Sequence, residues 1–179
     1  MRPLIALLWI VIPLCTANAQ QLLVMHREWA NDANDQSSDC VQVETDGSYR
    51  FEHTPFFRGQ QGPHEIHAGK LGEDEMKQLA VILDDPALES LATPSPGSGS
   101  MRGGAPFDYL LVVIDRSGQT QKLYFNSSGH NLSTGKHYPS IYQAPAIKPL
   151  WNWYKDVGKR KNNVDKTLAP LCSRDSKTR

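Results

Sequence analysis

The sequence lacks the motifs by which many enzymes and cofactor-binding proteins are identified. It contains no His-Glu-x-x-His helix, no Gly-x-Ser-x-Gly turn and no glycine loop that ends in Gly-Lys-Ser/Thr. These absences argue against a zinc protease, a nucleophile elbow and a phosphate-binding loop. We therefore expect no cofactor and no enzymatic activity.

Long apolar runs and net charge are missing as well. The apolar stretch at residues 4–14 falls short of the roughly 18 to 20 residues that a bilayer requires, so no transmembrane anchor is expected. Basic and acidic residues number 19 each, and no nucleic-acid partner is expected.

The charge is unevenly distributed at the C-terminal end, since residues 155–179 hold eight Lys or Arg against three Asp. We expect residues 161–179 to form a flexible basic tail; contact with an acidic envelope polymer or membrane is the alternative.

The N-terminus resembles a secretory signal peptide. Arg2 precedes the apolar stretch, and Ala17-Asn18-Ala19 is the small-x-small pattern after which signal peptidase cleaves. We expect cleavage near Ala19 and a secreted or periplasmic protein. The mature chain then keeps two cysteines, Cys40 and Cys172, which in an oxidising compartment most simply form one disulfide.

Hydrophobic periodicity predicts an α+β fold with a single domain over residues 20–160. The expected elements are a strand at 21–29, a hairpin of strands at 41–45 and 49–53, a helix at 73–83, a second hairpin at 107–114 and 120–125, and a helix at 144–159 whose regular part begins at Pro149. Asp46-Gly47 predicts a type I′ turn in the first hairpin. Residues 31–39 and 54–67 are expected to be loops. The predicted fold is an antiparallel sheet built from the two hairpins, with the intervening helix and the C-terminal helix packed on it.

The second hairpin is expected to lie at the centre of the sheet. Its first strand is apolar at successive positions, so both of its faces should be covered. We expect Tyr109, Leu111 and Val113 to face Leu79 and Leu83, and the other face to pack against the helix of Trp151 through Leu110, Val112 and Ile114. In the first hairpin and the first helix, the predicted core residues are Val41, Val43, Tyr49, Phe51, Met76, Leu79, Ala80 and Leu83.

Histidines form the one cluster with metal-ligand character. His64, His67, His130 and His137 lie in segments predicted to be loops, whereas zinc ligands normally converge from rigid elements. We expect solvated histidines and no metal. A hydrolase that uses these four histidines remains the alternative.

The candidate contacts to another protein are aromatic residues in loops, a tryptophan on the outer side of the C-terminal helix, and an arginine in the connection before the second hairpin. The positions selected are Phe56, Phe57, Arg102, Tyr138 and Trp153. Packing of the aromatics around the rim of the core is the competing interpretation.

Two Asn-x-Ser sequons, at Asn126 and Asn131, predict an exposed loop if the host glycosylates them.

The middle and end of the chain also show a family pattern. It consists of Leu71, Glu75, Leu79 and Leu83 in a helix, the strand entry Phe107-Asp108-Tyr109, Gly118 at a turn, and Ala144-Pro145 and Leu150-Trp151 in a closing helix. Over residues 40–157 this order resembles the emfourin family, small bacterial inhibitors of thermolysin-type metalloproteases. It is similar as well to uncharacterised secreted bacterial proteins of the same hairpin-helix-hairpin pattern. The resemblance implies protease inhibition, and no inhibitory residue is carried over because none matches by position.

Together these features predict a secreted, non-enzymatic module that binds another protein, either a protease or an envelope component. Long loops on a compact sheet support this hypothesis because binding residues are often in loops. A metal-dependent or other hydrolase and an envelope-associated structural protein remain the alternatives.

Overall fold

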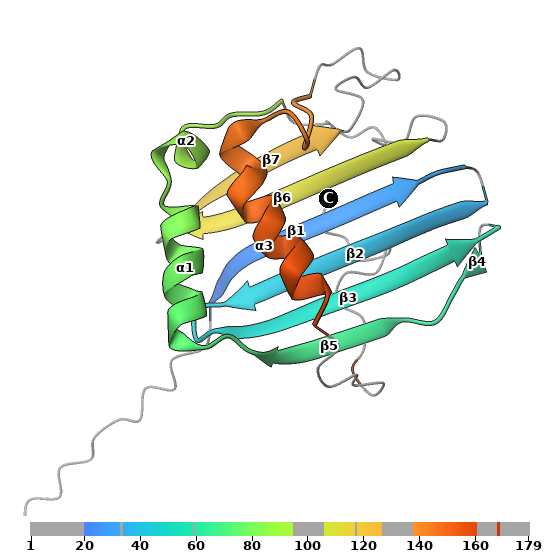
Figure 1. Ribbon diagram of the computed structural model, residues 1–179, viewed down its shortest axis with the longest axis horizontal. Helices are drawn as coiled ribbons and strands as arrows, with labels where there is room; N and C mark the ends of the chain where they lie inside the picture. Colours follow the sequence, from blue (N-terminus) through green and yellow to red (C-terminus); the bar gives the residue numbers. More distant parts are fainter. Residues whose placement is uncertain are drawn as a thin grey trace, which may run out of the picture.

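An antiparallel sheet with short helices makes up the described part of the chain (Figure 1). The computed structural model describes residues 20–32, 34–58, 60–94, 106–116, 118–126, 138–160 and 168. The strands are β1 (Gln21–Ala30), β2 (Asp35–Glu44), β3 (Ser48–Phe57), β4 (Gln60–Gln61), β5 (Glu65–Lys70), β6 (Phe107–Arg116) and β7 (Gln119–Asn126). The helices are α1 (Glu73–Leu83), α2 (Pro86–Glu89), the short 3-10 helix η1 (Pro145–Ile147) and α3 (Lys148–Gly158).

The first strand lies between the two predicted hairpins. The order of the sheet is β4-β3-β2-β1-β6-β7, and β5 joins β4 on the outer edge of β3. Leu23 of β1 pairs with Val43 on one side and with Ile114 on the other. The hairpin of β6 and β7 therefore ends the sheet, and the prediction that it is central was wrong. Strands β1 and β2 occupy the centre instead.

Large parts of the two segments predicted to be loops belong to strands. Residues 35–39 extend β2, residues 54–57 extend β3, residues 60–61 form β4, and residues 65–67 begin β5. Pairing along the whole length of β2 and β3 overrides their polar composition. The backbone of Pro55 faces the outer edge of β3, where its carbonyl accepts a hydrogen bond from Gly62 N at 2.7 Å. The missing N–H of Pro55 points to that same edge, so no bond to β2 is lost.

The turn between β2 and β3 differs from the predicted type I′ turn. A type I′ turn needs positive φ at both central residues, but Gly47 alone of this turn has positive φ, 85°. The loop has three residues, and Gly47 N donates to the Glu44 carbonyl at 3.0 Å. A type I turn closed by a left-handed glycine fits these features.

The described helices pack on one face of the sheet (Figure 1). On the hairpin of β6 and β7, Leu110, Val112 and Ile114 are fully buried in one core cluster, together with residues of α1, α2 and α3. Tyr109 clusters on the opposite face with Ala30 and Phe107. The prediction that the two faces of β6 divide between the two helices was therefore wrong. The core prediction for Val41, Val43, Tyr49 and Phe51 is confirmed.

The predicted helices are present, with one change in the face that α1 buries. Leu79 and Leu83 are buried as predicted, whereas Ala80 is exposed. The Glu75 carboxylate accepts a hydrogen bond from Gly72 N at 2.8 Å and so caps the first turn of α1. Pro149 lies in the first turn of α3, where proline is tolerated. The residues that α3 buries are Leu150, Trp151, Tyr154 and Val157.

The face of the sheet opposite the helices carries Cys40, which is buried. Its expected partner, Cys172, lies outside the described residues, so a bond between these two cysteines stays a prediction. Asn126 is only 2% exposed at the end of β7. Asn126 therefore does not lie in an exposed loop in this structure, and Asn131 lies outside the described residues; whether a host glycosylates either sequon stays a prediction.

Among the described helices, none has the length and apolar character needed to cross a membrane. The expected signal peptide at residues 1–19 and the expected tail at 161–179 lie outside the described residues, apart from Leu168.

Neighbouring leucines of β6 test the one-sided arrangement of the helices. Leu110→Ala should lower the free energy of unfolding by about 2–5 kcal/mol, because it leaves a cavity beneath the helices. Leu111→Ala should cost less, because Leu111 lies on the opposite face and is partly exposed. Urea denaturation followed by circular dichroism measures both. Equal losses, or a larger loss at Leu111, would contradict the arrangement.

Candidate functional site

A polar row across the sheet marks where the helix-covered core ends. The paired positions Arg27, Asp39, His53 and Glu65 follow one another across β1, β2, β3 and β5. Beyond this row, the same face carries residues that no described helix covers (Figure 1). We call this region the bare half-face and define it by Trp29, Ser37, Pro55, Phe57 and Asp108, which share the face by register.

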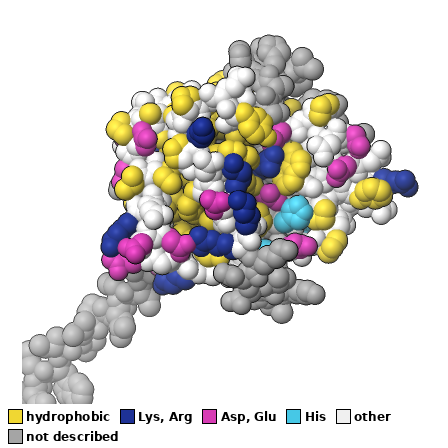
Figure 2. All heavy atoms as spheres, viewed as in Figure 1, with side chains coloured by type: hydrophobic (Ala, Val, Ile, Leu, Met, Phe, Trp, Pro, Cys, Tyr) yellow, Lys and Arg dark blue, Asp and Glu magenta, His cyan; other side chains and the backbone are white. Residues whose placement is uncertain are grey.

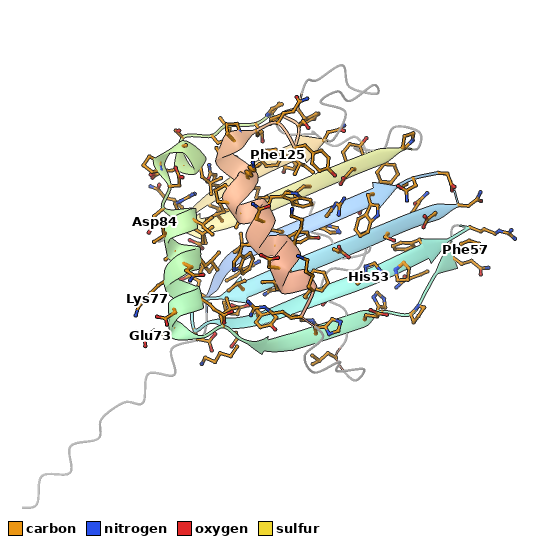
Figure 3. The ribbon with its side chains drawn as sticks, viewed as in Figure 1. His53, Phe57, Glu73, Lys77, Asp84 and Phe125 are labelled. Carbon is orange, nitrogen blue, oxygen red and sulfur yellow. The ribbon has the colours of Figure 1, made fainter. Side chains whose placement is uncertain are left out.

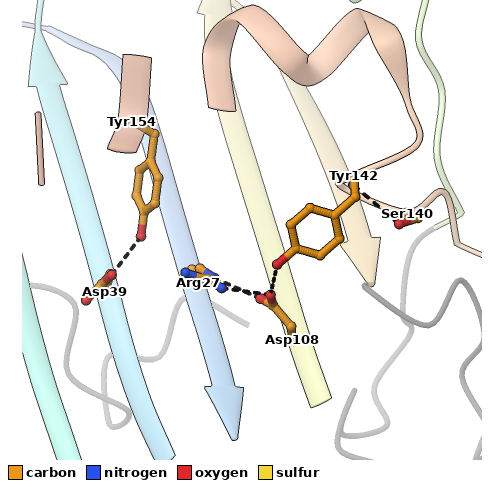
Figure 4. Close-up of polar contacts among 6 residues, drawn as sticks. All are labelled: Arg27, Asp39, Asp108, Ser140, Tyr142 and Tyr154. Carbon is orange, nitrogen blue, oxygen red and sulfur yellow. Dashed lines mark hydrogen bonds and ion pairs between the residues drawn. The ribbon is translucent and has the colours of Figure 1, made fainter. Parts of the chain in front are cut away.

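A bidentate ion pair occupies the boundary between the core and the bare half-face (Figure 4). Arg27 Nε and Nη2 donate to the two carboxylate oxygens of Asp108, each at 2.8 Å. The Tyr142 hydroxyl donates to Asp108 Oδ2 at 2.7 Å. The side chains of Arg27 and Asp108 are 19% and 11% exposed. Burial has the largest single effect and lowers the pKa of Arg27, but the hydrogen bond and the charge of Asp108, with smaller contributions from Tyr154 and Tyr142, together raise the net pKa. The guanidinium of Arg27 therefore stays charged.

Two tryptophan rings enclose the Arg27 guanidinium. Its central carbon lies 4.4 Å from the centroid of Trp29 and 5.0 Å from the centroid of Trp151. Trp151 in turn stacks on Tyr154, with centroids 5.1 Å apart and an interplanar angle of 15°. These contacts are cation–π and stacking interactions that fix the guanidinium plane. They join β1 to α3 through side chains.

Asp39 connects two strands to α3 (Figure 4). One carboxylate oxygen lies 2.6 Å from His53 Nδ1, and the other accepts a hydrogen bond from the Tyr154 hydroxyl at 3.2 Å. The bond to Asp39 raises the pKa of His53 above 6.5, against a smaller opposing effect of burial. Burial, and then the charge of Asp39, raise the pKa of Tyr154 well above its usual value. The phenol therefore stays protonated and donates to Asp39.

Two shallow hollows lie on either side of Tyr142. The strand-end hollow has a volume of about 380 Å³ and the α3 hollow about 370 Å³. Arg27 and Tyr142 line both. The other residues of the strand-end hollow are Trp29, Ala30, Asn31, Pro106, Phe107 and Asp108. The other residues of the α3 hollow are Ile141, Lys148, Trp151, Asn152 and Lys155.

The partner-binding residues selected from the sequence do not form one exposed patch. Phe57 is 63% exposed at the far end of β3, away from the helices (Figure 3). Phe56 is buried on the opposite face, Tyr138 is buried, and Trp153 packs partly buried against the core. Arg102 lies outside the described residues. Of the four described positions, Phe57 alone keeps the exposure that the hypothesis required.

The predicted histidine cluster is only partly described. The Thr54 hydroxyl lies 2.8 Å from His64 Nδ1, and His67 is buried with its ring 6.4 Å from that of Phe51. His130 and His137 lie outside the described residues. Within the described residues, no three His, Cys, Asp or Glu side chains are grouped to hold a metal ion.

Sequence reasoning missed Arg27, Trp29 and Asp108. Asp108 offered a signal, because a carboxylate inside an otherwise apolar strand needs a partner to be buried. The sequence did not show that this partner is Arg27, since Arg27 lies 81 residues away from Asp108 in the chain. Trp29 was included in a strand, but nothing in its spacing showed that its ring would contact a guanidinium.

Arg27 and Asp108, and His53 and Asp39, are held in ion pairs, whereas Lys148 and Lys155 line the α3 hollow beside Tyr142 and Trp151. No protein-family model matches this chain, and no curated protein is significantly similar to it.

Replacement of Asp108 tests how strongly the ion pair supports the site. Asp108→Asn should lower the free energy of unfolding by about 2–4 kcal/mol, because it leaves the largely buried Arg27 cation without its counter-charge. Lys77→Gln is the control, since it breaks the exposed i,i+4 pair with Glu73 on α1 (Figure 3) and should cost less than about 0.5 kcal/mol. Similar losses in the two variants, measured by urea denaturation, would contradict this ranking.

The His53–Asp39 contact should make stability depend on pH. Because the folded pKa of His53 is raised above 6.5, its contribution is fully present below pH 6.5 and is lost as the pH rises through the folded pKa. NMR titration of the ring and urea denaturation across this window measure the two effects. The Asp39→Asn variant should return the pKa of His53 towards 6.5 and flatten the pH dependence of stability. An unchanged His53 titration in this variant would rule out Asp39 as the cause.

Proposed function

We propose that this chain is a secreted or periplasmic, non-enzymatic module that binds another protein through the bare half-face and the adjoining α3 hollow. The observation that carries the proposal is the exposure of aromatic side chains where the helices stop covering the sheet. Phe57 and Tyr142 are 63% and 61% exposed, although large apolar side chains gain free energy on burial. A protein partner would bury them.

The composition of this surface fits a protein interface. Tryptophan, tyrosine and arginine are enriched in the residues that contribute most to binding. Arg27 and Tyr142 line both hollows, and Trp29 lines the strand-end hollow. The contacts of Arg27 to Asp108 and to both tryptophan rings hold this part of the surface rigid before a partner arrives. Rigid side chains lose less conformational entropy on binding.

Protease inhibition is the form of this function to test first, given the resemblance to the emfourin pattern. Leu79, Leu83, Leu150 and Trp151, which carry much of that pattern, are buried here. They support the core and would not themselves contact a protease. An inhibitory contact would have to come from the exposed aromatic surface.

Site-specific photo-crosslinking tests the location of the binding surface. We expect p-benzoylphenylalanine at position 57 or 142 of the secreted protein to form adducts with a protein of the host's extracytoplasmic fraction. Position 81 is the matched control, because Val81 is 74% exposed on α1, away from this surface. Absence of adducts at 57 and 142, or equal adducts at 81, would refute the proposal.

An activity assay of thermolysin in the presence of micromolar secreted protein tests whether the binding module is a protease inhibitor. Absence of inhibition would rule out inhibition of thermolysin-type proteases but not binding to another protein.

A further inference from the structure

The α3 hollow has an uncompensated positive charge. Three of its lining residues are cationic, namely Arg27, Lys148 and Lys155, and none of the seven is a carboxylate. Asp108 neutralises Arg27 from the neighbouring hollow. The two lysines therefore determine the charge of the hollow. Lys and Arg side chains gather along α3 on the visible face (Figure 2).

The two lysines differ from other lysines of the described helices. Lys77 pairs with Glu73 at 2.8 Å, and Lys159 pairs with Asp156 at 2.9 Å. Within the described residues, neither Lys148 nor Lys155 makes an ion pair. The Lys155 ammonium lies 5.9 Å from the centroid of the Trp151 ring, a contact that holds it over the hollow. An anionic ligand would find two available cations here.

The aromatic and apolar residues that line the α3 hollow indicate which kind of anionic ligand would fit. Trp151 and Tyr142 meet edge to face, with centroids 6.4 Å apart, and Ile141 is buried beside them. Such walls favour a ligand that carries apolar groups as well as charge. Lys148 and Lys155 are seven residues apart on one helix, which corresponds to a rise of about 10 Å. An extended chain spans that length in about three residues.

We propose that the α3 hollow binds an acidic segment of a partner protein, with carboxylates on Lys148 and Lys155 and the intervening side chains against Tyr142 and Trp151. This inference rests on the proposed function and specifies the chemistry of the partner. The charge of the hollow and the spacing of its lysines suit an extended polypeptide with two or more nearby Asp or Glu residues.

Fluorescence anisotropy with a labelled hexaglutamate peptide tests the inference on the full secreted chain. The peptide should bind, and binding should weaken when the ionic strength rises from about 0.01 M to about 0.15 M, because the Debye length falls from about 30 Å to about 8 Å. A hexaglutamine peptide of the same length should not bind. Peptide binding to the K148Q/K155Q double variant should be about tenfold weaker, from a loss of about threefold to fivefold for each lysine.

The matched control is the K77Q/K159Q double variant, which removes the same number of charges outside the hollow, one from α1 and one from the residue that follows α3. It should bind hexaglutamate like the parent chain. The inference is overturned if hexaglutamate does not bind, if both double variants weaken binding equally, or if hexathymidylate binds more tightly than hexaglutamate. The last result would assign the hollow to a nucleic acid.

The two proposals fail in different ways. Crosslinks at positions 57 and 142 without hexaglutamate binding would leave the binding module standing and remove the acidic segment. Hexaglutamate binding that depends on Lys148 and Lys155, without crosslinks at 57 or 142, would leave an anion-binding hollow and remove the binding module as defined by the bare half-face.

Discussion

The ion pair of Arg27 and Asp108 is the interaction on which this part of the structure depends. Its two hydrogen bonds join β1 to β6, and the guanidinium also contacts the ring of Trp151 on α3. Tyr142 reaches the same carboxylate from the segment before η1. One charged pair therefore positions two strands, a helix and a turn. Because the pair is largely buried, it tolerates little displacement of any of these parts.

Polar contacts also determine where α3 sits on the sheet. An apolar helix face on an apolar sheet could slide at modest cost, since hydrophobic attraction has no direction. Tyr154 can reach Asp39, and Trp151 can cover Arg27, only when α3 occupies one position. With α3 in this position, no described helix covers the outer ends of strands β1, β2 and β3 (Figure 1). Thus the surface proposed to bind a partner follows directly from the way in which the helix is fixed.

Local patterns in the sequence predicted most elements but not their arrangement. The spacing of Leu79, Leu83, Leu150 and Trp151 defined two helices. Alternation defined the first hairpin, and runs of β-branched and aromatic residues around a glycine turn defined the second, because these signals arise within one element. The insertion of β1 between the hairpins depends on pairing between distant residues, which no local pattern records. For the same reason the helix-covered face of β6 was assigned incorrectly. The candidate site was missed because its central contact joins residues 81 positions apart.

The position of β1 has a consequence for the order in which the chain folds. Strands β1, β2 and β3 follow one another in sequence and pair as neighbours, so their contacts can form as soon as they emerge from the ribosome or translocon. The other edge of β1 must wait for β6, since Asp108 lies 81 residues after Arg27. Until then, an edge strand that carries Leu23 and Met25 is open to pairing with other chains. During synthesis, protection of this edge of β1 until β6 pairs with it would reduce aggregation.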